Sequence, residues 1–409
     1  MNIVLEPGAA ALLDELHRAG FGAYAVGGCV RDSLLGLAPH DWDLCTAARP
    51  GQVMELFGED RCIPTGLQHG TVTVKRDGKL YEITTFRTEG RYSDGRHPDS
   101  VAFVPDLRED LARRDFTINA MAYSAEEGLC DPFGGREDLA RGVVRAVGEP
   151  LRRFGEDALR ILRLYRFAAR FGFAIDEATE AAAKQLAPHL DCVSAERIEE
   201  ELNKLLAAPQ PGAYLEPEVL AFVLPELPPE ELTKARRRID ALPAGTEQVS
   251  ARWAALLLPL GETGARKALK RLKCSNARID GAVALVRECG EKTPDTLDKC
   301  DLRLQAKRLL GKYDLHTVQQ LTALWTALAP EEKASFDALR AEAEALTAQG
   351  ACCRISQLAV NGRDLMAAGA APGPGLRRVL EALLEEVVTG RLPNEKTELL
   401  AFAAGFSAS

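Results

Sequence analysis

The sequence predicts an α+β protein in which a small domain with a mixed sheet precedes a remainder made of helices. The clearest strand signal is Thr71–Arg87, which alternates apolar and polar residues on both sides of Asp77-Gly78, a strong hairpin turn. Beyond Leu139 strand patterns almost disappear. Alanine- and leucine-rich helical periods continue from there to the end, interrupted by proline–glycine breaks.

Shorter elements are expected around this hairpin. The pattern predicts helices at 9–19 and from Val30 to Leu35, and strands at Tyr24–Val26 and Trp42–Cys45. The polar segment Thr88–Pro105 is expected to be a mobile loop. From Leu107 onward helices should dominate, including RRDFTINAMAY and GEDALRILRLYRFAARFGF, which end at Tyr123 and Phe173.

Composition limits the class of protein. The chain has 409 residues and 46% hydrophobic residues, enough for several domains or one elongated body. Its net charge of −9 opposes nucleic-acid binding only weakly, because binding to phosphates depends on local basic patches. Such patches occur in Arg141–Arg170, with eight arginines and three acids, and in 234–238 and 266–273, where a solvated helix face explains the charges about equally well.

The same composition predicts a cytoplasmic protein without membrane association. No apolar run is long enough to span a bilayer, and the N-terminal residues lack the basic flank of a signal peptide. Ten cysteines are scattered through the chain without a CxxC pair, a pattern typical of buried reduced thiols.

The most informative stretch is Tyr24–Thr46, YAVGGCVRDSLLGLAPHDWDLCT. Its glycine pair allows close approach of the backbone to a phosphate. On a strand, Asp41 and Asp43 would point to the same face and present two carboxylates, which bind hard cations well. Each feature alone is common in turns and caps, whereas their order within one short stretch predicts metal-assisted phosphoryl or nucleotidyl transfer.

This stretch resembles the signature of the nucleotidyltransferase superfamily that includes DNA polymerase beta. More narrowly, it resembles the class II tRNA nucleotidyltransferases, which comprise bacterial CCA-adding enzymes and poly(A) polymerases. The resemblance implies a polymerase-beta-like head at 1–139 and a helical neck at 140–207 that selects the nucleotide. It also implies a helical body at 208–330 and a helical tail at 331–409 that binds tRNA.

The resemblance assigns the metal and phosphate chemistry. Asp41 and Asp43 would bind two Mg²⁺ ions as catalytic residues, one to activate the RNA 3′-hydroxyl and one to hold the triphosphate, and Glu82 on the hairpin is the candidate third carboxylate. An outward-facing strand residue explains Glu82 equally well. Five residues are expected at the nucleotide phosphates. Gly27 and Gly28 would contribute the backbone of the turn, Arg31 and Arg114 their guanidinium groups, and Asp32 lies next to Arg31.

The segment RRDFTINAM resembles the ribose-reading motif of the family. Asp115 would accept a hydrogen bond from the 2′-hydroxyl, which a deoxynucleotide cannot donate. Asn119 lies four residues further on and would brace Asp115 from the same helical face.

The segment that begins at Gly155 contains Glu156, Asp157 and Arg160 and resembles the EDxxR motif of the family. Asp157 only accepts and Arg160 only donates hydrogen bonds, so the pair would accept adenine and cytosine and reject guanine and uracil. An ordinary surface ion pair is the alternative. Arg163 and Arg166 follow at three-residue steps, which drift around a helix by about 60° each, so the three arginines should not share one face.

Three further segments have expected roles. Ser194–Leu206 should be a helix that Ser194 caps and that supports the nucleotide-selecting helix. Glu89–Phe103 resembles the loop associated with the switch from adding C to adding A, and Asp131–Leu139 resembles a hinge. His40-Asp41 matches the HD dipeptide of phosphohydrolases, but no second HD follows, so that activity is not expected.

The function predicted from the resemblance is addition of CCA to the tRNA 3′ end from CTP and ATP without a nucleic-acid template. A poly(A) polymerase, an enzyme that adds only CC or only A, and a non-catalytic RNA-binding protein remain alternatives. A basic tail would favour the poly(A) polymerase, whereas this chain ends in AFAAGFSAS. The expected partners are tRNA, ATP and CTP, the expected cofactor is Mg²⁺, and the protein is expected to be a monomer or a homodimer.

Overall fold

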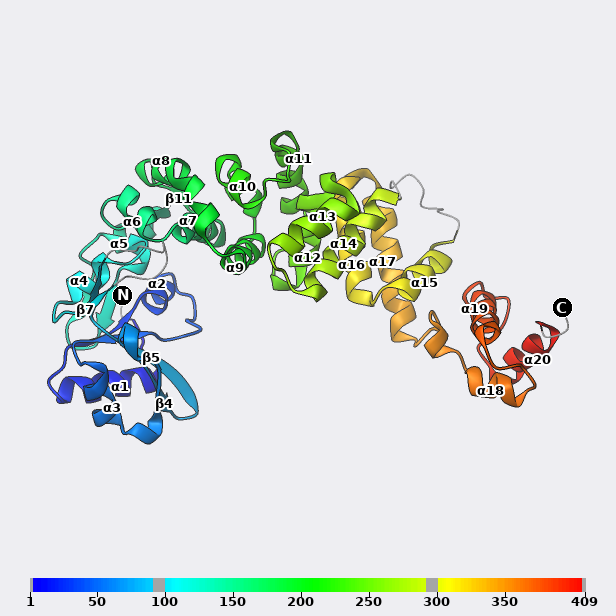
Figure 1. The fold of residues 1–409 in the computed structure, drawn as a ribbon, viewed down its shortest axis with the longest axis horizontal. Helices are drawn as coiled ribbons and strands as arrows, with labels where there is room; N and C mark the ends of the chain where they lie inside the picture. Colours follow the sequence, from blue (N-terminus) through cyan, green and yellow to red (C-terminus); the bar gives the residue numbers. More distant parts are fainter. Residues whose placement is uncertain (1–2, 91–99, 292–300, 407–409) are drawn as a thin grey trace. The chain divides into compact units, whose positions relative to one another are not determined.

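The computed structural model describes residues 3–90, 100–291 and 301–406 (Figure 1). Packing divides the chain into two compact units. The first comprises residues 1–229 with 271–273, and the second comprises residues 230–270 with 274–409. The finer division into head, neck, body and tail stays a prediction.

A seven-stranded mixed sheet forms the N-terminal part of the first unit. The strand order is β3-β4-β5-β2-β1-β8-β9. All neighbouring pairs are antiparallel except β2 and β5, which are parallel. In chain order the strands are β1 Ala23–Val26, β2 Leu44–Thr46, β3 Cys62–Gly66, β4 Thr71–Arg76, β5 Lys79–Thr85, β8 Ala122–Ser124 and β9 Gly128–Cys130.

The hairpin β4–β5 confirms the prediction from its turn. Asp77 and Gly78 have φ of 49° and 77°, the left-handed conformation that a tight two-residue turn requires. Only β2 is displaced from the prediction, because it begins at Leu44 rather than at Trp42.

Helices cover the sheet and complete its core. Helices α1 Pro7–Arg18 and α3 Pro50–Phe57 pack against the sheet, and α2 Gly28–Leu34 follows β1 directly (Figure 1). One buried apolar cluster joins strand residues to α4 Leu107–Ala112; its members include Tyr24, Val26, Cys45, Phe86, Leu111 and Ala122.

The segment Thr88–Pro105 differs at its ends from the predicted loop. β6 Arg87–Glu89 and β7 Val101–Phe103 pair as a small antiparallel sheet. The rest of the predicted loop, residues 91–99, lies outside the described residues.

The predicted helix at Arg113–Tyr123 is wrong. Phe116 is extended, Thr117–Asn119 forms a single 3₁₀ turn, and Ala122 already belongs to β8. The reason is burial on all sides: every residue from Asp115 to Ala122 is buried, so the segment threads the core instead of presenting one apolar face.

Helices dominate the remainder of the first unit. They are α5 Gly135–Arg141, α6 Pro150–Glu156, α7 Leu159–Phe171, α8 Glu177–Leu186, α9 Ala195–Leu206 and α10 Pro217–Val223. The predicted helix from Gly155 to Phe173 is broken, because Asp157 is extended between α6 and α7. Two short parallel strands, β10 Val143–Val144 and β11 Ala174–Ile175, are the small exception to a helical region.

The described part of the second unit is made of helices. They are α11 Pro229–Asp240, α12 Val249–Leu257, α13 Gly261–Arg271, α14 Asn276–Glu291, α15 Leu302–Lys312, α16 Leu315–Leu328, α17 Lys333–Ala348, α18 Gly362–Ala367, α19 Pro374–Val388 and α20 Lys396–Phe406. The predicted α+β class with a helical remainder is thereby confirmed. Among the helices of the described ranges, none combines the length and apolar content needed to cross a bilayer.

Close packing at the start of α5 gives a stability test. A Cβ atom on Gly135 would lie 2.2 Å from the Thr117 carbonyl oxygen and 3.0 Å from Met121 Cγ. Gly135→Ala should therefore destabilise the protein by about 1–3 kcal/mol through overpacking, measured as a lower thermal midpoint. Gly155→Ala is the matched control, because a Cβ there meets nothing within 4 Å. Equal midpoints for the two variants would contradict the packing described here.

Candidate active site

A glycine turn between β1 and α2 forms one wall of the candidate site. Gly27 has φ of 76°, and its N–H donates to the Met121 carbonyl at 3.1 Å. A Cβ on Gly27 would lie 3.0 Å from Arg114 Nη1. Glycine is therefore required both by the backbone conformation and by the guanidinium of Arg114, which lies against it.

The two aspartates lie just before β2 rather than on it. Val26 N–H donates to the Asp43 carbonyl at 3.0 Å, which places Asp43 beside the glycine turn. Asp41 is exposed, and its Oδ1 lies 3.0 Å from His40 Nδ1. The prediction that both aspartates share a strand face is wrong, because the strand begins one residue after Asp43.

Glu82 lies on the strand next to Asp43. Leu44 of β2 is in register with Ile83 of the parallel strand β5. The residues that precede them in the sequence, Asp43 and Glu82, are therefore also neighbours. The Glu82 side chain is exposed, while its neighbours Tyr81 and Ile83 are buried in the sheet. Register thus brings a third carboxylate to the side of Asp43.

The electrostatics of Asp43 fit a cation site. Burial raises the pKa of Asp43 above its usual value, and repulsion from Glu82 and Asp41 adds to this rise while Arg114 opposes it. A bound cation would relieve that repulsion. Within the described ranges no three His, Cys, Asp or Glu side chains already form a ligand cluster. Asp41 would have to turn from His40, an exposed partner that holds it weakly.

Asp115 is the centre of a buried polar cluster. Its Oδ1 accepts from Asn119 Nδ2 at 3.0 Å, and its Oδ2 accepts from Arg163 Nη2 at 2.5 Å and Nε at 2.8 Å. Burial alone would raise the pKa of Asp115, but the Arg163 charge and these hydrogen bonds outweigh burial and lower the pKa. Asn119 reaches Asp115 as predicted, across a 3₁₀ turn rather than along a helical face.

Asp157 and Arg160 are each held by other residues and not by one another. Asp157 accepts from Arg197 Nη2 at 2.8 Å, and its Oδ1 also accepts the Leu159 N–H at the start of α7. Arg160 donates to Glu156 Oε2 at 2.7 Å and to the Arg113 carbonyl at 3.1 Å. The two side chains are therefore fixed separately, which corrects the prediction of adjacent positions on one helix and also excludes a mutual surface ion pair in this structure.

Arg31 is buried beneath the glycine turn. It donates from Nε to Asp32 Oδ1 at 2.8 Å and from Nη1 to Asn119 Oδ1 at 2.5 Å. Arg170 reaches the other oxygen of Asp32 at 3.2 Å. Burial lowers the pKa of Arg31, and Asp32 opposes this.

Most of the predicted site residues line a single cavity of about 680 Å³. Of the predicted residues, those that line it are Gly27, Gly28, Arg31, Asp41, Asp43, Arg114, Asp115, Asn119, Asp157, Arg160, Arg163 and Arg166. Residues that the sequence did not assign to the nucleotide also line it, namely Arg113, Leu159, Phe167, Arg170, Arg197 and Lys204. The lining contains nine basic and four acidic side chains, so the cavity is suited to a polyanion.

Three predicted residues lie behind the lining. Glu82 adjoins Asp43, Asp32 orients Arg31, and Glu156 holds Arg160. Arg160, Arg163 and Arg166 extend from α7 over a broad arc, as their spacing predicts, and their long side chains all line the same cavity.

Helix α9 supports α7 as predicted, but by different contacts. Ser194 occupies the N-cap position without a side-chain cap bond. Support comes from Arg197, which binds Asp157, and from Glu201, which accepts from Arg166 Nε at 2.5 Å. Lys204 lies seven residues after Arg197, and this helical spacing was a signal that both basic side chains would face one side.

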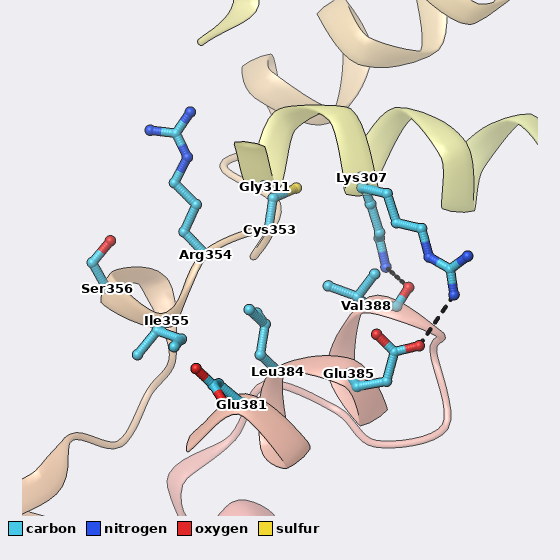
Figure 2. Close-up of a pocket in the computed structure, with 11 residues that line it drawn as sticks. Lys307, Gly311, Cys353, Arg354, Ile355, Ser356, Glu381, Leu384, Glu385 and Val388 are labelled. Atoms are coloured by element: carbon cyan, nitrogen blue, oxygen red, sulfur yellow. Dashed lines mark hydrogen bonds and ion pairs between the residues drawn. The ribbon is translucent and has the colours of Figure 1, made fainter. Parts of the chain in front are cut away.

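A second cavity, of about 450 Å³, lies in the second unit between α15, residues 353–356 and α19 (Figure 2). Its basic side chains serve the helices around it: Lys307 donates to the Val388 carbonyl at 3.0 Å, and Arg308 pairs with Glu385 at 3.2 Å. The two carboxylates of its described lining, Glu381 and Glu385, both come from α19, and Glu385 is already paired with Arg308, so this lining does not repeat the arrangement of the first cavity.

The mixed sheet, the glycine turn, the neighbouring carboxylates and the basic cavity together define a nucleotidyltransferase. Family models agree with this class along the chain. Residues 23–145 match the poly(A) polymerase head domain, and residues 172–228 match a probable RNA- and SrmB-binding site of polymerase A. Residues 245–403 match a putative domain 2 of tRNA nucleotidyltransferase.

Curated relatives narrow the class. The CCA-adding enzyme of Limosilactobacillus fermentum is 39% identical over 408 residues, covering 96% of this chain and 95% of the relative. That of Latilactobacillus sakei is 40% identical over 402 residues, covering 96% of each chain. The chain therefore belongs to the CCA-adding enzyme family.

Solved structures confirm the fold over nearly the whole chain. The crystal structure of the Bacillus stearothermophilus CCA-adding enzyme in complex with CTP is 33% identical, with a TM-score of 0.81, and covers 99% of this chain and 98% of its own. The Thermotoga maritima CCA-adding enzyme complexed with tRNA is 22% identical, with a TM-score of 0.71, and shares the fold over 98% of this chain and 96% of its own.

The ion pair at Asp115 predicts a pH-dependent stability. Because the folded-state pKa of Asp115 is lowered, its carboxylate stabilises the fold fully above the unfolded pKa near 4; this contribution declines below about pH 4 and is lost as pH falls through the lower folded-state pKa. Asp115→Asn should cost about 2–4 kcal/mol at pH 7, and less in acid. Urea unfolding at pH 7 and pH 3 measures both values. Asp60→Asn, at an exposed position, is the control, and a cost for Asp115→Asn that does not change with pH would contradict the ion pair.

Proposed function

We propose that this protein adds cytidine and adenosine monophosphates to the 3′ end of tRNA, from CTP and ATP, and completes the CCA sequence without a nucleic-acid template. One observation carries the proposal: a single basic cavity contains the paired aspartates, the buried ribose-reading candidate Asp115 and the pair Asp157 and Arg160. The CTP complex of the Bacillus stearothermophilus relative supports a nucleoside triphosphate as the ligand.

The cavity can receive the triphosphate at its glycine end. Arg31 and Arg114 lie beside the turn, where planar guanidinium groups bind phosphate oxygens well. Arg114 is held by Asp110 at 3.3 Å, so its orientation is set before the nucleotide arrives. Nucleotide binding therefore carries little entropy cost for ordering the Arg114 side chain.

Asp41 and Asp43, with Glu82 beside them, are the residues that would bind Mg²⁺. The cation would lower the pKa of the tRNA 3′-hydroxyl that attacks the α-phosphate and would neutralise charge on the triphosphate. These carboxylates suit Mg²⁺ because all of their ligand atoms are oxygen. The α-phosphate accepts the attacking oxygen, and pyrophosphate leaves toward the basic side chains around the turn.

Asp157 and Arg160 would sort the bases by hydrogen bonding. Adenine and cytosine each present an amino donor next to a ring-nitrogen acceptor, which match a carboxylate and a guanidinium. Guanine and uracil present a carbonyl next to an N–H, so both protein groups would be left unpaired. Arg197 binds Asp157 and Glu156 binds Arg160, so each of the two base-reading side chains is oriented by a partner of its own.

Ribose discrimination is proposed for Asp115. Its Oδ1 accepts from Asn119 and from the Phe116 N–H, and its Oδ2 accepts twice from Arg163, so a 2′-hydroxyl would bind by displacing or sharing one of these donors. The helical body and tail are proposed to hold the tRNA.

The cytoplasm is the proposed compartment of the protein. Free cysteines, of which the described residues include nine, are usual there because the cytoplasm keeps thiols reduced.

A direct test of the carboxylates uses Asp43→Asn. The substitution keeps the size of the side chain and removes the charge that would bind Mg²⁺, so transfer should fall at least ~1000-fold while tRNA binding persists. The measurement is incorporation of labelled CTP and ATP into tRNA lacking CCA. Asp60→Asn serves as the control on an exposed turn. Normal turnover by Asp43→Asn would reject the assignment, and long A tracts from the unmodified protein would indicate a poly(A) polymerase.

Base selection is tested by Arg160→Lys. Lysine keeps the charge but lacks the planar pair of donors, so discrimination against GTP and UTP should weaken by about 10- to 100-fold. Competition among four nucleoside triphosphates gives the ratio directly. Arg152→Lys is the matched control, because Arg152 is an exposed arginine bound to the same Glu156. An unchanged ratio for Arg160→Lys would count against base reading by this residue.

A further inference from the structure

Two phenylalanines of α7 lie among the arginines of the candidate site. Phe167 and Phe171 are one helical turn apart, with ring centroids separated by 6.3 Å and planes inclined by 4°. Guanidinium groups lie within 5.4 Å of one or both centroids; they belong to Arg31, Arg163, Arg166 and Arg170. The rings thus supply negative faces to a cluster of four positive charges.

Arg31 differs from the other three because it comes from α2 and not from α7. Its Cζ lies 5.2 Å from the Phe167 centroid and 5.0 Å from that of Phe171. Its polar edge is held by Asp32 and Asn119. The Asp32 carboxylate and the Asn119 amide bind the nitrogen atoms of the Arg31 guanidinium, and the two aromatic rings pack beside it. The guanidinium is therefore restrained from two directions.

The two rings have different positions relative to the cavity. Phe167 is part of its lining, and Phe171, the last residue of α7, is not. Phe171 reaches the nucleotide site through its contacts with Phe167, Arg31 and Arg170. Arg170 in turn binds Asp32, the carboxylate that orients Arg31, so the contacts of Phe171 with both arginines bear on the Arg31 guanidinium.

We propose that Phe171 is a positioning residue for nucleotidyl transfer, which holds the Arg31 guanidinium toward the triphosphate by a cation–π interaction. The inference rests on the proposed function, in which Arg31 faces the phosphates. Attraction between a cation and an aromatic face strengthens with withdrawal from water; Arg31 is 3% exposed, and Phe171 is half-buried. An aliphatic side chain would fill the same space without this attraction.

If Phe171 positions Arg31, its loss should affect the kinetics differently from a general loss of packing around α7. CTP and ATP carry the same triphosphate, so loss of the ring should impair both substrates equally. Base choice should not change, because Asp157 and Arg160 are held by Arg197 and Glu156 at the opposite end of α7. A general loosening of α7 would instead disturb base choice as well.

The experiment compares Phe171→Leu, Phe171→Tyr and a trifluorinated phenylalanine at position 171. Fluorine withdraws electron density from the ring face and leaves its shape nearly unchanged, so this variant tests the attraction even if Phe171→Leu folds poorly. Phe173→Leu is the matched control, since the Phe173 ring lies 5.4 Å from that of Phe171 within the same aromatic group. Steady-state kinetics with CTP and ATP, a four-nucleotide competition and the thermal midpoint are measured for each.

Phe171→Leu and the fluorinated protein should lose about 2- to 30-fold in kcat/KM for both nucleotides. Phe171→Tyr should restore the activity, and the ratio among the four nucleotides should stay constant. Activity of the fluorinated protein equal to that of the unmodified protein would overturn the proposal, as would altered base choice. Absence of transfer by the unmodified protein would instead reject the proposed function, so the two failures are distinguishable.

Discussion

Charge balance around one cavity is the constraint on which the rest of the first unit depends. Nine basic side chains line the same space as four carboxylates, and their mutual repulsion must be offset before a substrate arrives. The structure offsets it locally: Asp115 holds Arg163, Glu201 holds Arg166, and Asp32 holds both Arg31 and Arg170. These ion pairs also connect the sheet domain to α7 and α7 to α9. The same contacts therefore balance the charge in the cavity and hold its walls together.

Local motifs predicted the parts of the site that depend on backbone conformation, but not the pairs that depend on tertiary packing. Gly27 and the Asp77-Gly78 turn depend on backbone conformation, which neighbouring residues determine, and both were predicted. Partners of long side chains from separate elements depend on tertiary packing, so the pairing of Arg197 with Asp157 could not be read from spacing, whereas Glu156 and Arg160 lie four residues apart. Lys204 was missed although it repeats the position of Arg197 after seven residues.

The errors in secondary structure have physical causes. Residues 115–122 have no solvent-exposed face, because even the polar Asp115, Thr117 and Asn119 are buried, and periodicity cannot distinguish such a segment from a buried helix. The break at Asp157 did have a signal, since an aspartate before an apolar run often caps a helix, and Asp157 accepts the Leu159 N–H. At this break the Asp157 carboxylate binds Arg197, while Arg160 binds Glu156.

A crystal structure of the protein with CTP, and a second with ATP, tests the central claim most directly. The account predicts that the cytosine and adenine rings occupy the same position, with the Watson–Crick edge of each directed at the Asp157 carboxylate and the Arg160 guanidinium. A base that faces away from these two side chains, or two bases that use different protein groups, would contradict it.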